Sequence, residues 1–184
     1  MRIIAGKYRG RLLTTADDLT VRPTTDRAKQ TIFDILSARI EFDGIHVLDL
    51  FAGSGSLGLE ALSRGASTVT FVEKAKRSLV LAERNIKNLG CESESTLYQA
   101  DVFWYLKNTK QSYDLAFADP PYKLEMIETI PERVFESSVL KENGYLVMEH
   151  SKETVAELNP SHYEITRKPF GQTVVLILKK LAKH

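Results

Sequence analysis

The stretch VLDLFAGSGSLG, residues 47–58, passes from an apolar run into three glycines spaced as G-x-G-x-x-G. The glycines are Gly53, Gly55 and Gly58, and Glu73 closes the next apolar run, 20 residues after Gly53. Between a strand and a helix, this pattern is typical of a loop that binds an adenosine-type cofactor, with the acid on the ribose hydroxyls. A tight turn that uses glycine only for close packing is the alternative.

Strand-like and helix-like segments alternate on both sides of this loop. Apolar runs predict strands at residues 45–51, 67–73, 95–100, 113–118 and 144–150. Helical spacing predicts helices at residues 28–40, 56–65, 74–90, 101–108 and 124–136, the first capped by Thr24 or Thr25. Residues 162–180 predict a hairpin. The alternation indicates an α/β fold, with a mostly parallel sheet, helices on both faces and an antiparallel C-terminal hairpin.

The N-terminal residues carry a local excess of positive charge. Residues 1–15 contain four basic side chains and no acid, although the net charge of the whole chain is only +1. Residues 2–13 predict two short strands around a turn. We therefore expect a small β-hairpin extension at residues 1–20, a flexible arm whose charge is compatible with nucleic-acid contact, and one larger domain at residues 21–184. A solvated surface hairpin is the alternative.

Cysteine and histidine usage suggests an ordinary intracellular chain. The single cysteine, Cys91, allows no internal disulfide, and no apolar run approaches the length of a membrane span. No secretory leader is recognisable at the start. The four histidines show no metal-ligand spacing. We therefore expect a cytoplasmic protein without a metal, and we take a monomer as the default.

Acidic residues follow three of the predicted strands, at the edge of the sheet where ligands bind in such folds. Asp49 lies four residues before Gly53, Glu73 ends the next strand, and Asp101 follows the third. A pyrophosphate would gain nothing from a carboxylate at this edge, whereas S-adenosylmethionine carries an ammonium and a sulfonium group and no phosphate. The three acids therefore favour S-adenosylmethionine over a nicotinamide dinucleotide. Asp101 is also a candidate N-cap for the helix that follows it.

A second motif, DPPY at residues 119–122, ends the predicted strand LAFA. Proline cannot donate within a sheet, so the strand must stop near Ala118. A carboxylate and an exposed aromatic ring, Asp119 and Tyr122, on so stiff a corner suit a site that grips a flat group. The alternative is a stiff turn without chemistry.

These motifs, in this order, resemble those of class I S-adenosylmethionine-dependent methyltransferases, and DPPY resembles the motif of the amino-methyltransferases. The segments RIIAGKYRGRLL, RPTTDRAKQTIFDIL and FGQTVVLIL are similar to those of the RsmD family, bacterial enzymes that methylate N2 of a guanine in 16S ribosomal RNA. The resemblance covers nearly the whole chain. It implies a Rossmann-like seven-stranded fold, S-adenosylmethionine as cofactor with S-adenosylhomocysteine as product, and the small ribosomal subunit RNA or its assembling particle as partner.

The resemblance also implies roles for particular residues. The expected catalytic residues are Asp119, Pro120, Pro121 and Tyr122. The expected cofactor-binding residues are Asp49, Phe51, Ala52, Gly53, Gly55, Glu73, Lys74, Asp101 and Val102. The expected RNA-contacting residues are Arg2, Lys7, Tyr8, Arg9, Arg11, Arg22 and Arg27.

Other functions are compatible with parts of the sequence. DPPY alone does not separate guanine N2 from adenine N6 in DNA or RNA as the methylated atom. An NAD-dependent oxidoreductase is disfavoured by the acids beside the glycine loop. A non-catalytic RNA-binding subunit on the same fold is disfavoured by the intact DPPY.

Overall fold

The computed structural model describes residues 1–15, 26–154, 158 and 162–181. Their centre is a seven-stranded sheet in the order β3-β2-β1-β4-β5-β7-β6. Five of the strands, β1 to β5, are parallel, while β7 runs antiparallel to both β5 and β6. The strands are β1 (His46–Leu50), β2 (Thr68–Glu73), β3 (Ser95–Gln99), β4 (Tyr113–Ala118), β5 (Leu140–Ser151), β6 (Tyr163–Phe170) and β7 (Thr173–Lys180). The predicted parallel sheet and its antiparallel C-terminal hairpin are confirmed.

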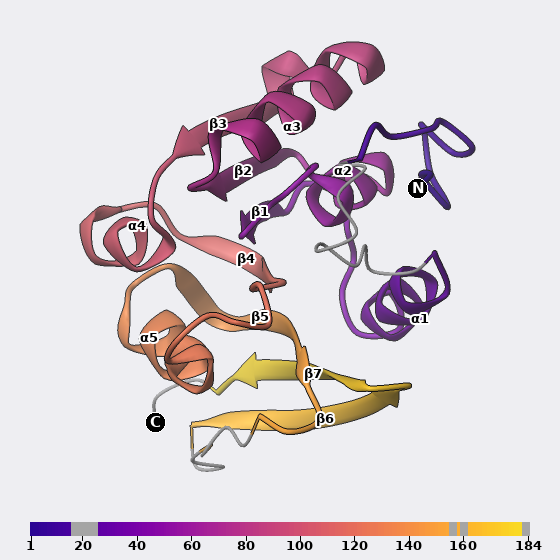
Figure 1. Ribbon diagram of the computed structural model, residues 1–184. Coiled ribbons are helices and arrows are strands. Elements are labelled where there is room, and N and C mark those ends of the chain that lie inside the picture. The colour runs from indigo at the N-terminus through magenta and orange to yellow at the C-terminus, as the bar shows by residue number, and fades with distance from the viewer. Residues whose placement is uncertain (16–25, 155–157, 159–161, 182–184) are drawn as a thin grey trace.

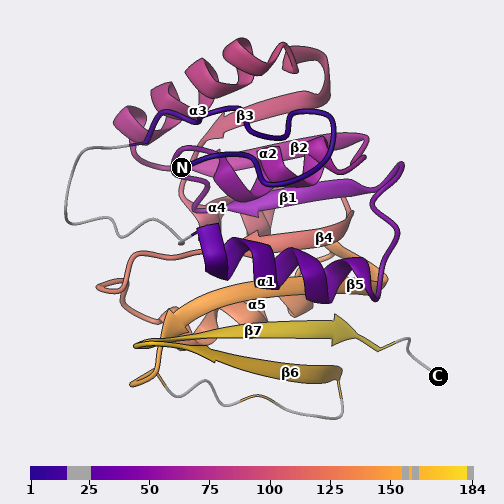
Figure 2. The same ribbon diagram turned by 90° about the vertical axis from the view of Figure 1, so that its right-hand side faces the viewer.

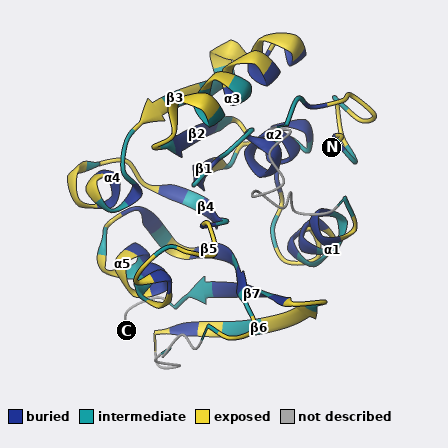
Figure 3. Ribbon diagram, in the orientation of Figure 1, coloured by how far each residue is buried: buried dark blue, intermediate teal, exposed yellow. Residues whose placement is uncertain are grey.

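Helices cover both faces of this sheet (Figures 1 and 2). On one face, α1 (Asp26–Ser37), α2 (Ser56–Ser63) and α3 (Lys76–Leu89) pack over a core that includes Phe33, Phe71 and Phe117. On the other face, α4 (Val102–Asn108) and α5 (Ile130–Glu136) pack over a second core around Leu48 and Leu146. The central strands are therefore buried on both sides (Figure 3), as their continuous apolar sequences require.

Several predicted elements differ from the structure at their ends. The first helix, α1, stops at Ser37 and not at residue 40, and β5 begins at Leu140 and not at residue 144. The segment 124–136 is helical only from Ile127, as a short 3₁₀ turn (Ile127–Thr129) that leads into α5. Met126 adopts a left-handed backbone with φ 63°, which an α-helix beginning at residue 124 cannot contain. The predicted caps of the first helix, Thr24 and Thr25, lie outside the described residues.

The N-terminal segment, residues 1–15, folds back on itself without forming two strands. It contains one isolated antiparallel bridge, between Arg2 and Leu12, and the Ile3 amide donates to the Arg11 carbonyl at 2.9 Å. Ile3 and Leu13 are buried in the same core as α1 and α2, so the segment lies against the domain (Figures 1 and 2). The expectation of two strands in a free arm is therefore wrong: the segment's apolar residues anchor it to the core. The expected boundary at residue 20 lies outside the described residues.

Candidate functional site

The expected cofactor and catalytic acids gather at one edge of the sheet. Strand register places Leu50 beside both Val72 and Ala118, so Phe51, Glu73 and Asp119 all follow directly at the carboxyl ends of adjacent strands. Asp119 and Glu73 lie near enough to Asp49 to raise its pKa by charge repulsion. The fold thus brings together three acids that are up to 70 residues apart in the chain.

The glycine loop joins β1 to α2 through a series of left-handed residues. Phe51, Gly53 and Gly55 have φ values of 57°, 56° and 81°. Gly55 is the N-cap of α2, where its positive φ directs the chain into the helix. At Gly58, an added Cβ would lie 2.5 Å from the Phe71 ring, so glycine is needed there for close packing of the helix on the sheet.

Asp49 lies beneath this loop with only 2% of its surface exposed. Its Oδ2 accepts a hydrogen bond of 2.9 Å from the Gly58 amide. Burial raises the pKa of Asp49 from 3.8 to about 8; the Gly58 hydrogen bond opposes this rise, and the neighbouring acids Asp119 and Glu73 add to it. Because the folded pKa exceeds the unfolded one, this group lowers the free energy of unfolding as pH rises from about 4 to about 8. A cation bound beside Asp49 would offset that cost.

Glu73 holds the far side of the glycine loop. Its Oε2 accepts from the Gly53 amide at 3.0 Å and its Oε1 accepts from the Ala75 amide at 2.7 Å. Both bonds fix the carboxylate at the end of β2, and each oxygen retains a further lone pair. This arrangement presents an oriented acceptor to a pair of vicinal hydroxyls.

Asp101 caps α4, as expected, with its Oδ1 accepting from the Phe103 and Trp104 amides at 3.0 and 3.2 Å. Its Oδ2 lies 3.2 Å from Lys74 Nζ in an exposed ion pair. Burial acts to raise the pKa of Asp101, but the Trp104 amide and the Lys74 ammonium outweigh it and hold the pKa below its ordinary value. Val102, the expected backbone contact, is itself buried at the start of α4.

The DPPY corner follows β4 at the same edge. Pro120 is buried, whereas Pro121 and Tyr122 are exposed, Tyr122 by 46%. The Pro121 carbonyl accepts from the Leu124 amide at 2.8 Å, which closes a turn after the corner. A half-buried Asp119 and an exposed Tyr122 ring thus stand on a backbone that the two prolines make stiff.

The described members of the expected RNA-contacting set lie in different surroundings. Arg2 forms an exposed ion pair with Asp26 at 3.5 Å, and Lys7 pairs with Glu94 at 3.4 Å. Arg11 donates to the Asn88 carbonyl at 2.6 Å, Tyr8 packs against the core, and Arg27 is exposed at the start of α1. Arg22 lies outside the described residues.

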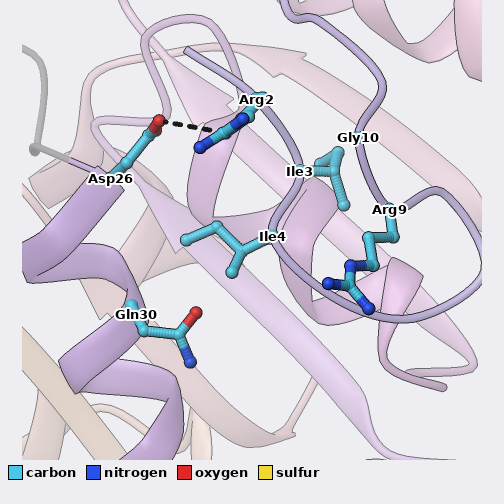
Figure 4. A pocket seen from close by; sticks show the side chains of 7 residues that line it. All are labelled: Arg2, Ile3, Ile4, Arg9, Gly10, Asp26 and Gln30. Atoms are coloured by element: carbon cyan, nitrogen blue, oxygen red, sulfur yellow. Dashed lines mark ion pairs between the residues drawn. The ribbon is translucent and has the colours of Figure 1, made fainter.

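Arg9 and Arg2 line a pocket of about 300 Å³ between the N-terminal segment and α1 (Figure 4). Asp26 and Gln30 of α1 form its opposite side. Since Arg2 is paired with Asp26, Arg9 is the cation of this pocket that makes no ion pair with the residues described. The pocket can therefore accept an anionic group next to polar side chains.

Sequence reasoning missed the polar residues that hold the N-terminal segment in place. Glu60 is fully buried in α2 and accepts from the amides of Ile4 and Ala5 at 2.8 and 3.1 Å. Lys29 and Asn85, also fully buried, bind other parts of the segment. The sequence contains a feature that could have revealed two of them: Lys29 and Asn85 each interrupt the apolar stripe of an amphipathic helix.

Among the described residues, no three His, Cys, Asp or Glu side chains form a group that could hold a metal ion. None of the helices in the described part of the chain is both long and apolar enough to cross a membrane.

The family model described as "Conserved hypothetical protein 95" matches residues 1–179. The chain belongs to this family. It is 38% identical to the ribosomal RNA small subunit methyltransferase D of Haemophilus influenzae, over 83% of this chain and 80% of that protein. It is 30% identical to the protein of the same name from Escherichia coli, over 100% of this chain and 91% of that protein. The expected membership of the RsmD family is therefore confirmed, and with it membership of a family of methyltransferases.

Solved structures of other proteins show the same architecture. The Escherichia coli protein yhhF matches with a TM-score of 0.88 and 28% identity, over 100% of this chain and 99% of that chain. Protein TTHA0928 of Thermus thermophilus matches with a TM-score of 0.83 and 27% identity, over 96% of this chain and 98% of that chain. The shared fold thus extends over nearly the whole chain.

Proposed function

We propose that this protein transfers a methyl group from S-adenosylmethionine to the exocyclic N2 of a guanine in 16S ribosomal RNA. The observation that carries the proposal is the placement of Asp119, in the DPPY corner, beside the glycine loop and its buried acid Asp49. Relatives named as small-subunit ribosomal RNA methyltransferases support the RNA as substrate.

The residues at the sheet edge suit S-adenosylmethionine. Among the described residues, buried Asp49 accepts from the Gly58 amide and its charged neighbours are the acids Asp119 and Glu73, so a cationic ligand would supply a basic partner. Glu73 offers oriented acceptors to the ribose hydroxyls, and Asp101 with the Val102 amide would bind the adenine amino group and ring nitrogen. Phe51, Ala52, Gly53 and Gly55 form the backbone cradle, and Lys74 stands beside Asp101. When bound, this cofactor supplies an activated methyl group on sulfur.

The DPPY corner suits methylation of an amino group on a base. Such a nitrogen is a poor nucleophile because its lone pair is delocalised into the ring. The Asp119 carboxylate and the Pro120 carbonyl would each accept a hydrogen bond from one of its two N–H groups. These two bonds favour a tetrahedral nitrogen with an available lone pair. Tyr122 would stack on the base after it leaves its own stack. Asp119 would also stabilise the positive charge that develops on nitrogen as the C–N bond forms and the C–S bond breaks.

Cofactor affinity is expected to depend on pH through Asp49. Below about pH 8 the Asp49 carboxyl holds a proton, and it must release that proton when a cation binds beside it. The dissociation constant should therefore fall as pH rises from 6 to 8, by at most about tenfold per pH unit, and level off above that. Titration calorimetry over this pH range measures it.

The Asp49→Asn variant separates this effect from ionisation of the ligand's own amino group. It removes the protein's titrating carboxyl but keeps an acceptor for the Gly58 amide. We expect Asp49→Asn to bind the cofactor more weakly than the unchanged chain at pH 8. Its dissociation constant should no longer fall between pH 6 and 8 through the protein's own carboxyl. An unchanged pH profile in Asp49→Asn would show that Asp49 does not face the cation.

The pocket beneath the N-terminal segment is the proposed place for an RNA phosphate, which would bind Arg9, the cation there that forms no ion pair with another described residue. Replacing Arg9 by alanine should weaken RNA binding several-fold and reduce the slope of log Kd against log salt concentration by about one. Filter binding with 16S RNA across a salt series measures both quantities. Lys110→Ala, an exposed cation between α4 and β4, is the matched control and should leave the slope unchanged. Equal slopes for Arg9→Ala and the unchanged chain would remove this pocket from the RNA interface.

The partner is thus proposed to be the small-subunit RNA or its assembling particle, in the cytoplasm, with the protein acting as a monomer. Residues 1–20 would serve mainly in RNA contact and residues 21–184 in catalysis. Incubation with labelled S-adenosylmethionine and unmodified small subunits, naked 16S RNA or DNA tests the substrate. Label in DNA alone would overturn the proposal in favour of the adenine-N6 alternative.

A further inference from the structure

We propose that Asn85 is a positioning residue that joins the N-terminal segment to the glycine loop, so that docking of the segment and binding of the cofactor strengthen each other. The inference rests on the proposed function for the identity of the cofactor. It goes beyond that function because it makes residues 1–15 a structural part of the cofactor site.

The side chain of Asn85, fully buried on α3, makes three hydrogen bonds. Its Oδ1 accepts from the Thr14 amide at 2.8 Å, and its Nδ2 donates to the Thr14 carbonyl at 2.9 Å. The same Nδ2 donates to the Ser54 carbonyl at 2.9 Å. One amide thus holds the end of the N-terminal segment and the middle of the glycine loop together.

Only an amide at this position can satisfy all three partners. Two carbonyls and one N–H face the side chain, and Asn offers two donors and an acceptor in one plane. Aspartate has nearly the same shape, but it would place a carboxylate oxygen against the carbonyls of Thr14 and Ser54. An apolar residue would leave all three groups buried without a partner.

Among the described residues, several side chains hold residues 53–58, and two of them belong to the proposed cofactor site. Gly53 is bound by Glu73 and Gly58 by Asp49. Ser56 bonds to Met1 and Lys29, and Lys29 also donates to the Arg2 carbonyl, which ties the start of the segment to the same loop. Asn85 holds Ser54, which lies between the left-handed Gly53 and Gly55. A shift of the Asn85 amide would therefore move the part of the loop that is proposed to pass the cofactor.

The N-terminal segment is anchored independently at its other end. Glu60 binds the amides of Ile4 and Ala5, and Ser63 binds the Lys7 and Tyr8 amides. Gly6 packs so closely that an added Cβ would lie 1.7 Å from the Ser63 carbonyl oxygen. The segment can thus be displaced by a change at Gly6 that touches neither Asn85 nor the glycine loop.

Coupling of this kind must act in both directions. A cofactor that orders the glycine loop should tighten the segment through Asn85, and an undocked segment should weaken cofactor binding. Because Arg2 and Arg9 belong to the segment, the proposed RNA surface is then best ordered when the cofactor is bound.

Hydrogen exchange tests the coupling without any RNA. Saturation with S-adenosylhomocysteine should slow exchange in residues 1–15 of the unchanged chain by about threefold to tenfold. In Asn85→Asp, at a concentration that saturates that variant, residues 11–15, the part of the segment next to the Asn85 contact at Thr14, should exchange at the same rate with and without the ligand. A merely structural role would raise the exchange rate but leave the ligand's effect in place. Asn108→Asp, an exposed amide on α4 on the other face of the sheet, is the matched control and should behave as the unchanged chain.

Gly6→Ala keeps the proposal testable if Asn85→Asp fails to fold. This variant should release the segment and raise the dissociation constant of S-adenosylhomocysteine about threefold or more. A released segment with unchanged affinity would overturn the coupling. So would ligand binding to the unchanged chain without protection of residues 1–15, whereas no binding at all would overturn the proposed function itself.

Discussion

The Asp119→Ala variant is expected to transfer methyl groups at least about 10²–10³-fold more slowly than the unchanged protein, with cofactor affinity altered by less than about twofold. The rate should fall this far because the variant lacks the Asp119 carboxylate, a charged hydrogen-bond acceptor next to the nitrogen on which positive charge develops. Cofactor binding should survive because Glu73 and Asp101 supply the proposed contacts to the adenosine. Single-turnover transfer to 16S RNA, measured beside calorimetric binding of S-adenosylhomocysteine, separates the two effects.

Two further variants sharpen this test. Asp119→Asn keeps one acceptor oxygen but no charge, so its rate should fall between those of the unchanged chain and Asp119→Ala. Lys123→Ala, an exposed residue just beyond DPPY, should retain the full rate. Full activity in Asp119→Ala would show that the corner is a stiff turn without chemistry.

The second large effect is expected at Glu73. Glu73→Ala should raise the dissociation constant of S-adenosylmethionine by about 100-fold or more, because two charge-assisted hydrogen bonds to ribose hydroxyls are lost, each contributing about 1.5–3 kcal/mol. The variant also removes the acceptor of the Gly53 amide, which loosens the glycine loop. Calorimetry at fixed pH measures the change.

The matched control is Glu83→Ala, which removes an exposed carboxylate on α3 that pairs with Lys87. It should bind the cofactor as tightly as the unchanged chain. Glu73→Gln retains one acceptor oxygen, and its affinity for S-adenosylmethionine should fall about tenfold. A change below about threefold in Glu73→Ala would mean that the ribose is held elsewhere.

Much of this site could be predicted because its residues follow strands. Gly53, Glu73, Asp101 and Asp119 stand immediately after apolar runs whose order in the chain sets their place in a parallel sheet. Strand ends on a parallel sheet meet at one edge, so a local pattern was enough to bring them together. Their individual roles toward cofactor and base stay predictions, to be tested by the variants described above.

The N-terminal segment could not be predicted in the same way. Its basic residues and glycines are compatible with a free hairpin, and its anchors, Lys29, Glu60 and Asn85, come from three different helices. Those contacts span 27 to 71 residues and depend on how helices pack, which no local pattern specifies. The buried Ile3 and Leu13 decide the outcome, because leaving them exposed would forfeit about 1.5–3 kcal/mol each.

The central claim is tested most directly by identifying the methylated nucleoside. Unmodified 16S RNA or small subunits would be incubated with the protein and labelled S-adenosylmethionine, digested to nucleosides and separated beside standards. We expect label in N2-methylguanosine, formed at least about 100-fold more slowly when Asp119→Ala replaces the unchanged chain. Label in N6-methyladenosine, or label formed by Asp119→Ala at the rate of the unchanged chain, would contradict the proposal.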